Sequence, residues 1–197
     1  RQRQMCIRDR GYGGVRAFTA TSGPGLSLMA ESISMAAVAE IPVVIIDVMR
    51  AGPSTGMATK VEQSDIRYAV GSGHGDAEKI VLAAASIEDC YYIVQEAFNL
   101  AEEYQTPVIV LSDLQFGMCK QSVPAFDRNR IGIRRGKLVT EGLSELDMKT
   151  KSYFHRFEDT EDGISPRTIP GVKNGMFLST GLEHNVFGKP AEGPVSY

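Results

Sequence analysis

The stretch Pro42-Val-Val-Ile-Ile-Asp-Val-Met-Arg50 decides the fold class, because a proline opens a short, continuous run of β-branched residues. A run of this kind is typical of a strand that is covered on both faces, as in a parallel sheet. Residues 107–112, Pro-Val-Ile-Val-Leu-Ser, repeat the pattern. Residues 15–20 and 79–83 predict two shorter strands, so the sequence predicts four strands in all.

Helix-forming segments separate these strands. Residues 26–40 are rich in Leu, Met and Ala and are apolar nearly all round, which predicts one buried helix. Ser86 opens the capping-box pattern Ser-x-x-Asp, which predicts a long helix from there to about Tyr104. A short helix is predicted over residues 62–70. Strands that alternate with helices favour an α/β domain with a parallel sheet and right-handed crossovers.

The 197 residues have an ordinary globular composition, with 43% apolar residues and a formal net charge of −3. This composition excludes a wholly disordered chain and argues against broad nucleic-acid binding, which needs a basic face. The longest apolar run is strand-sized, well below the roughly 20 residues of a membrane span. Cys6, Cys90 and Cys119 are too scattered for a disulfide framework or a metal site, which favours the reducing cytoplasm.

The two ends of the chain differ from its middle. Residues 1–10 contain four arginines and no apolar segment of a secretory signal, and they resemble translated sequencing-adapter sequence. We expect a non-native leader whose removal changes the free energy of unfolding by no more than about 0.5 kcal/mol; a basic RNA-binding arm is the alternative. Residues 11–127 are expected to form the α/β domain. Residues 128–197 are polar and punctuated by prolines, which predicts an extended connection toward a following domain.

Polar loops follow the predicted strands at their carboxyl ends, where parallel sheets bind ligands. Residues 22–27 and 52–60 are rich in glycine, yet neither matches a phosphate-binding pattern, so tight turns are favoured over nucleotide binding. Arg50 comes directly after a strand, and its planar guanidinium suits a carboxylate held through two hydrogen bonds. The alternative is a salt bridge from Arg50 to Asp47, Glu62 or Asp65.

Several blocks of sequence, taken together, resemble one family. They are residues 15–31 with Thr-Ser-Gly-Pro-Gly, residues 40–56 with Arg-Ala-Gly-Pro-Ser-Thr-Gly, residues 62–65, 73–75, 97–102 and 106–113, and the tail around Thr180-Gly-Leu-Glu-His184. Over about residues 11–197 the chain resembles the alpha subunit of 2-oxoacid:ferredoxin oxidoreductases, most closely the 2-oxoglutarate branch.

The resemblance implies a three-layer, parallel-sheet, thiamine-diphosphate-binding fold of the pyrimidine-binding type, incomplete here at its N-terminus. Enzymes of this family oxidatively decarboxylate a 2-oxoacid on thiamine diphosphate, capture the acyl group on coenzyme A and pass electrons through iron–sulfur clusters to ferredoxin. The resemblance also implies that a beta subunit holds the diphosphate, the magnesium ion and the nearest cluster. The implied partners are therefore the beta subunit, the 2-oxoacid, coenzyme A and ferredoxin.

The resemblance assigns site residues as well. Arg50 matches the arginine that holds the 2-oxoacid carboxylate, and Ser54 and Thr55 fall in the loop that closes on the substrate. The turn Thr21-Ser22-Gly23 matches the strand-end turn that faces the thiamine site. The family's catalytic glutamate and its tyrosine–proline–isoleucine–threonine–proline motif belong upstream of the first strand. We therefore expect no catalytic residue in this chain, and no activity from the chain by itself.

Two alternatives stay open. A non-catalytic scaffold or interaction domain of the same fold would also lack the glutamate, and the sequence upstream of Val15 would decide between scaffold and enzyme. The pyruvate-type branch of the family shares the loop that carries Arg50, so the identity of the 2-oxoacid is not settled by these residues.

Overall fold

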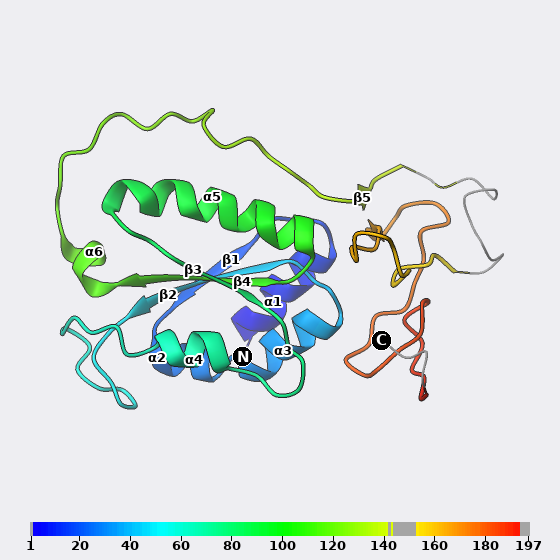
Figure 1. Ribbon diagram of the computed structural model, residues 1–197, viewed down its shortest axis with the longest axis horizontal. Helices are drawn as coiled ribbons and strands as arrows, with labels where there is room; N and C mark the ends of the chain where they lie inside the picture. Colours follow the sequence, from blue (N-terminus) through cyan, green and yellow to red (C-terminus); the bar gives the residue numbers. More distant parts are fainter. Residues whose placement is uncertain (1, 142, 144–152, 194–197) are drawn as a thin grey trace.

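The computed structural model describes residues 2–141, 143 and 153–193. Its centre is a four-stranded sheet in the order β1-β2-β4-β3, formed by β1 (Phe18–Thr21), β2 (Val43–Met49), β4 (Pro107–Asp113) and β3 (Ile80–Ala83) (Figure 1). All three strand pairs are parallel, and β2 pairs with β4 along the full length of both strands. The predicted parallel sheet is confirmed.

Helices cover both faces of the sheet (Figure 1). One face carries α5 (Ile87–Tyr104), and the other carries α2 (Gly23–Ser27), α3 (Ala30–Val38) and α4 (Ile66–Gly71). Because side chains alternate along a strand, Val44 of β2 packs toward α5 while its neighbour Ile45 packs toward α2 and α3. The central strands are thus buried on both faces, and the expected three-layer architecture is confirmed.

The prediction of one helix over residues 26–40 is wrong, because the segment forms two helices, α2 and α3. The Met29 backbone N–H donates to the Leu26 carbonyl oxygen three residues back, at 2.9 Å, which tightens the chain between them. This turn leaves Leu28 79% exposed and places Met29 in the core beside Ile33. The break therefore keeps the apolar side of both helices on the sheet.

The helix predicted over residues 62–70 begins later, since α4 starts at Ile66. The residues before it are tied to the ends of strands instead. Ser64 Oγ donates to the Arg50 carbonyl oxygen at 2.8 Å, and Gln63 Nε2 donates to Asp113 Oδ2 at 3.2 Å. Residues 62–65 therefore form a loop that lies beside the carboxyl ends of β2 and β4.

Ser86 is the N-cap of α5, as predicted, and its side chain accepts a hydrogen bond from the Asp89 backbone N–H at 3.0 Å. We expect Ser86→Ala to lower the free energy of unfolding by about 1 kcal/mol, the usual cost of losing such a cap. Urea unfolding measures the difference. Ser27→Ala is the matched control, because the Ser27 hydroxyl bonds back to the Gly23 carbonyl oxygen within α2 and its loss should cost less than about 0.5 kcal/mol. Equal losses in the two variants would contradict the capping role.

Residues at the N-terminus form a helix, α1 (Gln2–Tyr12), that packs against α3 and the sheet. Ile7 is 7% exposed and lies in an apolar cluster with Ala36, Ile41 and Val43. Burial of such a side chain contributes about 1.5–3 kcal/mol to the free energy of unfolding. This does not agree with the expectation that removing residues 1–10 changes that free energy by no more than about 0.5 kcal/mol. One buried isoleucine among arginines gives no periodicity, which is why the sequence pattern misses it. That residues 1–10 are a non-native leader stays a prediction.

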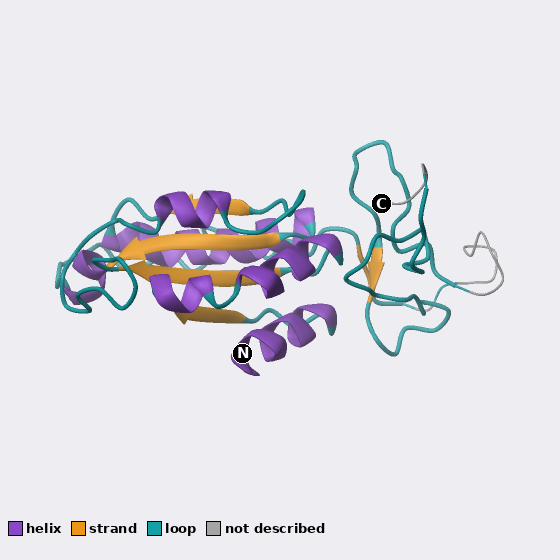
Figure 2. Ribbon diagram, turned by 90° about the horizontal axis from the view of Figure 1, so that it is seen from below, coloured by secondary structure: helices purple, strands orange, loops and turns teal. Residues whose placement is uncertain are grey.

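A long connection, residues 119–137, leads from the end of the sheet past α5 to a region built mostly of loops (Figures 1 and 2). The helix α6 (Leu114–Met118) precedes the connection, and β5 (Leu138–Val139) pairs in parallel with β6 (Arg167–Thr168) beyond it. Residues 153–193 lie at the amino end of the main sheet, away from the loop of residues 51–60 (Figure 1). A domain boundary at residue 127 and a following domain stay predictions.

Candidate functional site

A hollow of about 370 Å³ opens at the carboxyl ends of β1 and β2. Three loops meet around it: the turn from β1 into α2, the loop that leaves β2, and the loop that leads into α4. Its lining comes from within residues 23–27, 50–54 and 62–68. Parallel sheets bind ligands at this edge, which makes the hollow the candidate site.

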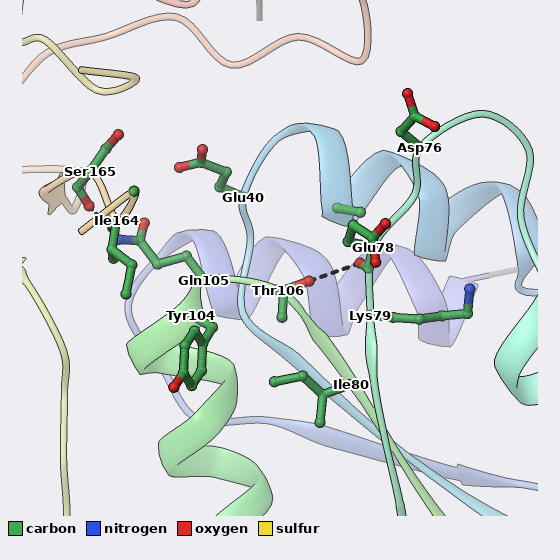
Figure 3. Close-up of a pocket in the computed structure, with 12 residues that line it drawn as sticks. Glu40, Asp76, Glu78, Lys79, Ile80, Tyr104, Gln105, Thr106, Ile164 and Ser165 are labelled. Carbon is green, nitrogen blue, oxygen red and sulfur yellow. Dashed lines mark hydrogen bonds between the residues drawn. The ribbon is translucent and has the colours of Figure 1, made fainter. Parts of the chain in front are cut away.

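A larger hollow, of about 640 Å³, lies at the opposite, amino end of the sheet (Figure 3). Several of its polar groups already bond within the fold. Thr106 Oγ1 donates to the Glu78 carbonyl oxygen at 2.9 Å, and the Glu40 carboxylate pairs with Arg156 at 2.6 Å. Size alone therefore does not select the functional site, and the strand-end hollow is the better candidate because it holds an arginine whose charge is not paired within the described residues.

Arg50 supplies the positive charge of the candidate hollow. It comes directly after β2, and the Ser64 hydroxyl holds its carbonyl oxygen, which fixes the point from which the side chain extends. Among the described residues, its buried Nε has no hydrogen-bond partner, and no carboxylate lies within 4.0 Å of the guanidinium. The alternative of a salt bridge to Asp47, Glu62 or Asp65 is therefore wrong. The guanidinium is available to an anion in the hollow.

The loop after Arg50 has a fixed shape. The Met57 backbone N–H donates to the Ala51 carbonyl oxygen at 2.9 Å and closes the loop. Gly56 has a φ of 54°, and a Cβ there would lie 1.8 Å from that same carbonyl oxygen, so the turn requires glycine. Ser54 lines the hollow, whereas Thr55 is exposed and is not part of its lining.

The turn after β1 carries the other predicted residues. Thr21 ends β1 opposite Asp47 of β2, and Ser22 is the N-cap residue of α2. The Ser22 Oγ is buried and has no hydrogen-bond partner within the described part of the chain. Gly23 lines the hollow, and a Cβ there would lie 2.5 Å from Asp65 Oδ1, so only glycine lets the turn pass that carboxyl. Thr21 and Ser22 are not part of the lining.

Two lining residues on the α4 side are not predicted from the sequence. From the sequence, Asp65 is treated as a possible salt-bridge partner of Arg50 and as part of the block 62–65, and Tyr68 only as part of a predicted helix; neither residue is assigned to the site. The Tyr68 hydroxyl donates to the Ser27 carbonyl oxygen at 3.3 Å and so joins α4 to α2 across the hollow.

Asp47 of β2 is a further residue that is not predicted to have a role at the site. Its burial, then the negative charge of Asp65 and a hydrogen bond to it, raise the pKa of Asp47 to about 7. A charged residue inside an apolar strand is the signal that could have pointed to Asp47.

The remaining candidate chemistry is sparse. Cys6, Cys90 and Cys119 are free cysteines. Within residues 2–141, 143 and 153–193, no three or more His, Cys, Asp or Glu side chains gather as a group that could bind one metal ion. Over the same part of the chain, no helix combines the length and the apolar character that crossing a membrane requires.

Comparisons with known proteins agree on one family. Residues 11–195 match the family described as pyruvate flavodoxin/ferredoxin oxidoreductase, thiamine diphosphate-binding. The chain is 48% identical over 184 residues to subunit alpha of 2-oxoacid:ferredoxin oxidoreductase 2 of Aeropyrum pernix, with 92% of this chain and 27% of the relative covered. It is 54% identical over 194 residues to the KorA subunit of 2-oxoglutarate synthase of Archaeoglobus fulgidus, with 88% of this chain and 55% of the relative covered.

A solved structure gives the same result. The 2-oxoglutarate:ferredoxin oxidoreductase from Magnetococcus marinus, with 2-oxoglutarate, coenzyme A and succinyl-CoA bound, matches with a TM-score of 0.87 and 40% identity. The match covers 97% of this chain and 32% of that one. The chain thus spans between about a quarter and just over half the length of the curated relatives named above. The resemblance seen in the sequence is confirmed, and the chain belongs to the pyruvate flavodoxin/ferredoxin oxidoreductase family, within its thiamine diphosphate-binding domain.

Proposed function

We propose that the chain is part of the alpha subunit of a 2-oxoacid:ferredoxin oxidoreductase, which oxidatively decarboxylates a 2-oxoacid to an acyl-CoA and passes the electrons to ferredoxin. The observation that carries the proposal is the guanidinium of Arg50, unpaired within the described residues and placed at the carboxyl end of the sheet in a chain of this family. The names of the relatives, 2-oxoacid:ferredoxin oxidoreductase and 2-oxoglutarate synthase, support the same reaction.

Arg50 is proposed to hold the substrate carboxylate. A guanidinium can donate two parallel hydrogen bonds to the carboxylate next to the keto group, and this fixes the reacting carbon in one orientation. Ser54 lines the same hollow, and its hydroxyl can donate to a substrate oxygen. Thr55, one residue further along the loop, is proposed to approach the substrate when the loop closes on it.

The favoured substrate is 2-oxoglutarate. Relatives that match most of this chain are named 2-oxoglutarate synthase, and the structural neighbour holds 2-oxoglutarate. Pyruvate is the substrate to compare with it, because both acids carry the carboxylate that Arg50 is proposed to bind. The two differ in the second carboxylate, so the ratio of their kcat/KM values decides between the two branches.

Thiamine diphosphate is the proposed cofactor, shared with a beta subunit. When bound, it supplies the carbanion-stabilising chemistry by which a 2-oxoacid loses carbon dioxide. The turn of residues 21–23 supports this assignment, because Gly23 lines the hollow and the Ser22 Oγ next to it is buried without a partner in the described chain. We assign the diphosphate, its magnesium ion and the nearest iron–sulfur cluster to the beta subunit, and we propose the cytoplasm as the location of the complex.

The chain by itself is expected to show no 2-oxoacid-dependent reduction of ferredoxin or of an artificial dye. It carries a wall of the proposed site, whereas the catalytic glutamate, the diphosphate site and the clusters are assigned to other parts of the enzyme. The measurement compares the purified chain with the complete alpha–beta enzyme, both assayed with 2-oxoglutarate, coenzyme A and thiamine diphosphate. Turnover by the chain without a partner would contradict the proposal, and so would a complete enzyme that reduces neither acceptor with any 2-oxoacid.

A further inference from the structure

Asp47 is a carboxyl group in the middle of the apolar core. It lies in β2 between β1 and β4, opposite Thr21 and Leu111, and it is fully buried at 0% exposure. Neither of its carboxyl oxygens meets a hydrogen-bond donor or a cation among the described residues. An ionised carboxylate in such a place loses its hydration and gains no hydrogen bond or counter-charge, so the ionised form is strongly unfavourable.

Asp65 is the group that faces Asp47. It comes directly before α4, lines the Arg50 hollow and lies within hydrogen-bonding reach of Asp47. Its Oδ2 is also buried, with no donor within the described chain, and its Oδ1 lies against Gly23. Two ionised carboxylates only accept hydrogen bonds, so this contact is favourable only when one of the two carries a proton.

The surroundings leave Asp47 as the better holder of that proton. The strand β1 and the helix α2 present no titratable side chain to it, because their sequences contain none. The titratable or charged groups on the other segments near this end of β2 are Glu31 of α3, Arg50 and Glu62 of the loops, Arg67 and Tyr68 of α4, and Asp113 of β4. The helix α1 packs beside Val43 at the other end of β2 and carries Cys6, Arg8, Asp9, Arg10 and Tyr12. None of these groups shifts the pKa of Asp47; burial raises it most, and the charge of Asp65 raises it further.

We propose that Asp47 and Asp65 share one proton, carried by Asp47, and that this hydrogen bond positions Asp65 and the start of α4 at the wall of the Arg50 hollow. Asp47 is then a positioning residue, because it is buried outside the lining of the hollow and acts through Asp65. The bond crosses from the sheet to α4 directly behind Gly23, where three of the site's segments meet. The acid pair stands on the geometry of this chain, while its effect on substrate binding rests on the proposed function.

The first test is the dependence of stability on pH. The unfolded chain releases the Asp47 proton near pH 4, whereas the folded chain keeps it to about pH 7, so the folded state holds more protons between these values. Stability therefore falls as pH rises through this window. Asp47→Asn keeps an N–H donor toward Asp65 and has no proton to lose. As pH rises from 5 to 7, the ratio of folded to unfolded protein should therefore increase for Asp47→Asn relative to the wild type, by roughly tenfold for each pH unit.

Two further variants of the same chain keep this test decisive. Asp65→Asn removes the facing charge and offers a donor to Asp47, so it should also flatten the fall in stability between pH 5 and 7. Asp76→Asn changes an exposed aspartate and should run parallel to the wild type. If the gap between Asp47→Asn and the wild type stayed constant from pH 5 to 8, and Asp65→Asn also ran parallel to the wild type, the shared proton would be disproved.

The second test is the pH profile of KM for the 2-oxoacid in the complete enzyme. Above pH 7 the wild type loses the shared proton and the two carboxylates repel, so its KM should rise severalfold relative to that of Asp47→Asn, with a smaller change in kcat. A KM ratio that stays constant from pH 6 to 8 would overturn the positioning role. A wild-type enzyme that turns over no 2-oxoacid would instead refute the proposed function, and the stability test would still decide on the acid pair.

Discussion

Arg50→Ala should lower kcat/KM for the 2-oxoacid by roughly 10- to 150-fold in the complete enzyme, because each charge-assisted hydrogen bond to the substrate carboxylate is worth about 1.5–3 kcal/mol. The change should leave the fold intact, since the buried Nε of Arg50 has no partner within the described chain and the substitution breaks no ion pair there. The Ser64 hydroxyl bonds to the Arg50 carbonyl oxygen, which alanine retains. Steady-state kinetics, with a melting curve on the same preparation, measures the effect.

Arg50→Lys and Arg67→Ala are the comparison variants. Lysine should restore only part of the loss, because an ammonium group lacks the planar fork that matches a carboxylate. Arg67 is exposed on α4 and does not line the hollow, so its removal should leave kcat/KM within about twofold. Thiamine diphosphate affinity should change little in any variant. A folded Arg50→Ala enzyme with wild-type kcat/KM would show that another group binds the carboxylate.

The parts of the fold that local sequence determines could be predicted. The strands β2 and β4 are continuous apolar runs because both of their faces are covered, so their burial can be recognised from the sequence alone. The start of α5 is likewise local, since the Ser86 side chain reaches a backbone N–H three residues on. Arg50 could be placed at the binding edge because it follows such a strand immediately.

The features that depend on distant parts of the chain could not be predicted. The break between α2 and α3 turns Leu28 outward and Met29 inward. Packing against the sheet, and not the helix propensity of these residues, determines this orientation. Residues 62–65 form a loop because Ser64 bonds to a strand end fourteen residues away. The pairing of Asp47 with Asp65 requires β2 and the start of α4 to meet in space, which no spacing in the sequence expresses.

A contact that holds the loop region of residues 153–193 (the second region) to the α/β domain is also non-local, and it is centred on Glu102 of α5. Glu102 is 3% exposed, and its carboxylate meets three arginines: Arg16 at 2.7 Å, Arg135 at 3.1 Å and Arg167 at 3.0 Å. Arg167 is itself 3% exposed. Burial lowers the pKa of Arg167 to about 10, and Glu102 acts in the opposite direction. The carboxylate therefore keeps a buried guanidinium charged.

Glu102→Gln is expected to lower the free energy of unfolding by about 3–5 kcal/mol. Glutamine has nearly the same shape, but it removes the negative charge and leaves the buried guanidinium of Arg167 without its counter-charge. Arg167 Nη1 also donates to the Gly11 carbonyl oxygen at 3.4 Å, but this hydrogen bond is long and its acceptor is uncharged, so it cannot take over this role. Urea unfolding followed by circular dichroism gives the difference directly.

The adjacent residue provides the matched control. Glu103 also pairs with an arginine, Arg134, at 2.6 Å, but the Arg134 side chain is 42% exposed. Water replaces much of that interaction when it is lost, so Glu103→Gln should cost no more than about 1 kcal/mol. A similar small loss in both variants would show that water or the neighbouring carbonyl groups compensate Arg167 and that Glu102 does not anchor the second region. If only Glu102→Gln lowers the free energy of unfolding by several kcal/mol, the stability of this contact depends on the burial of the ion pair and not on the number of ion pairs.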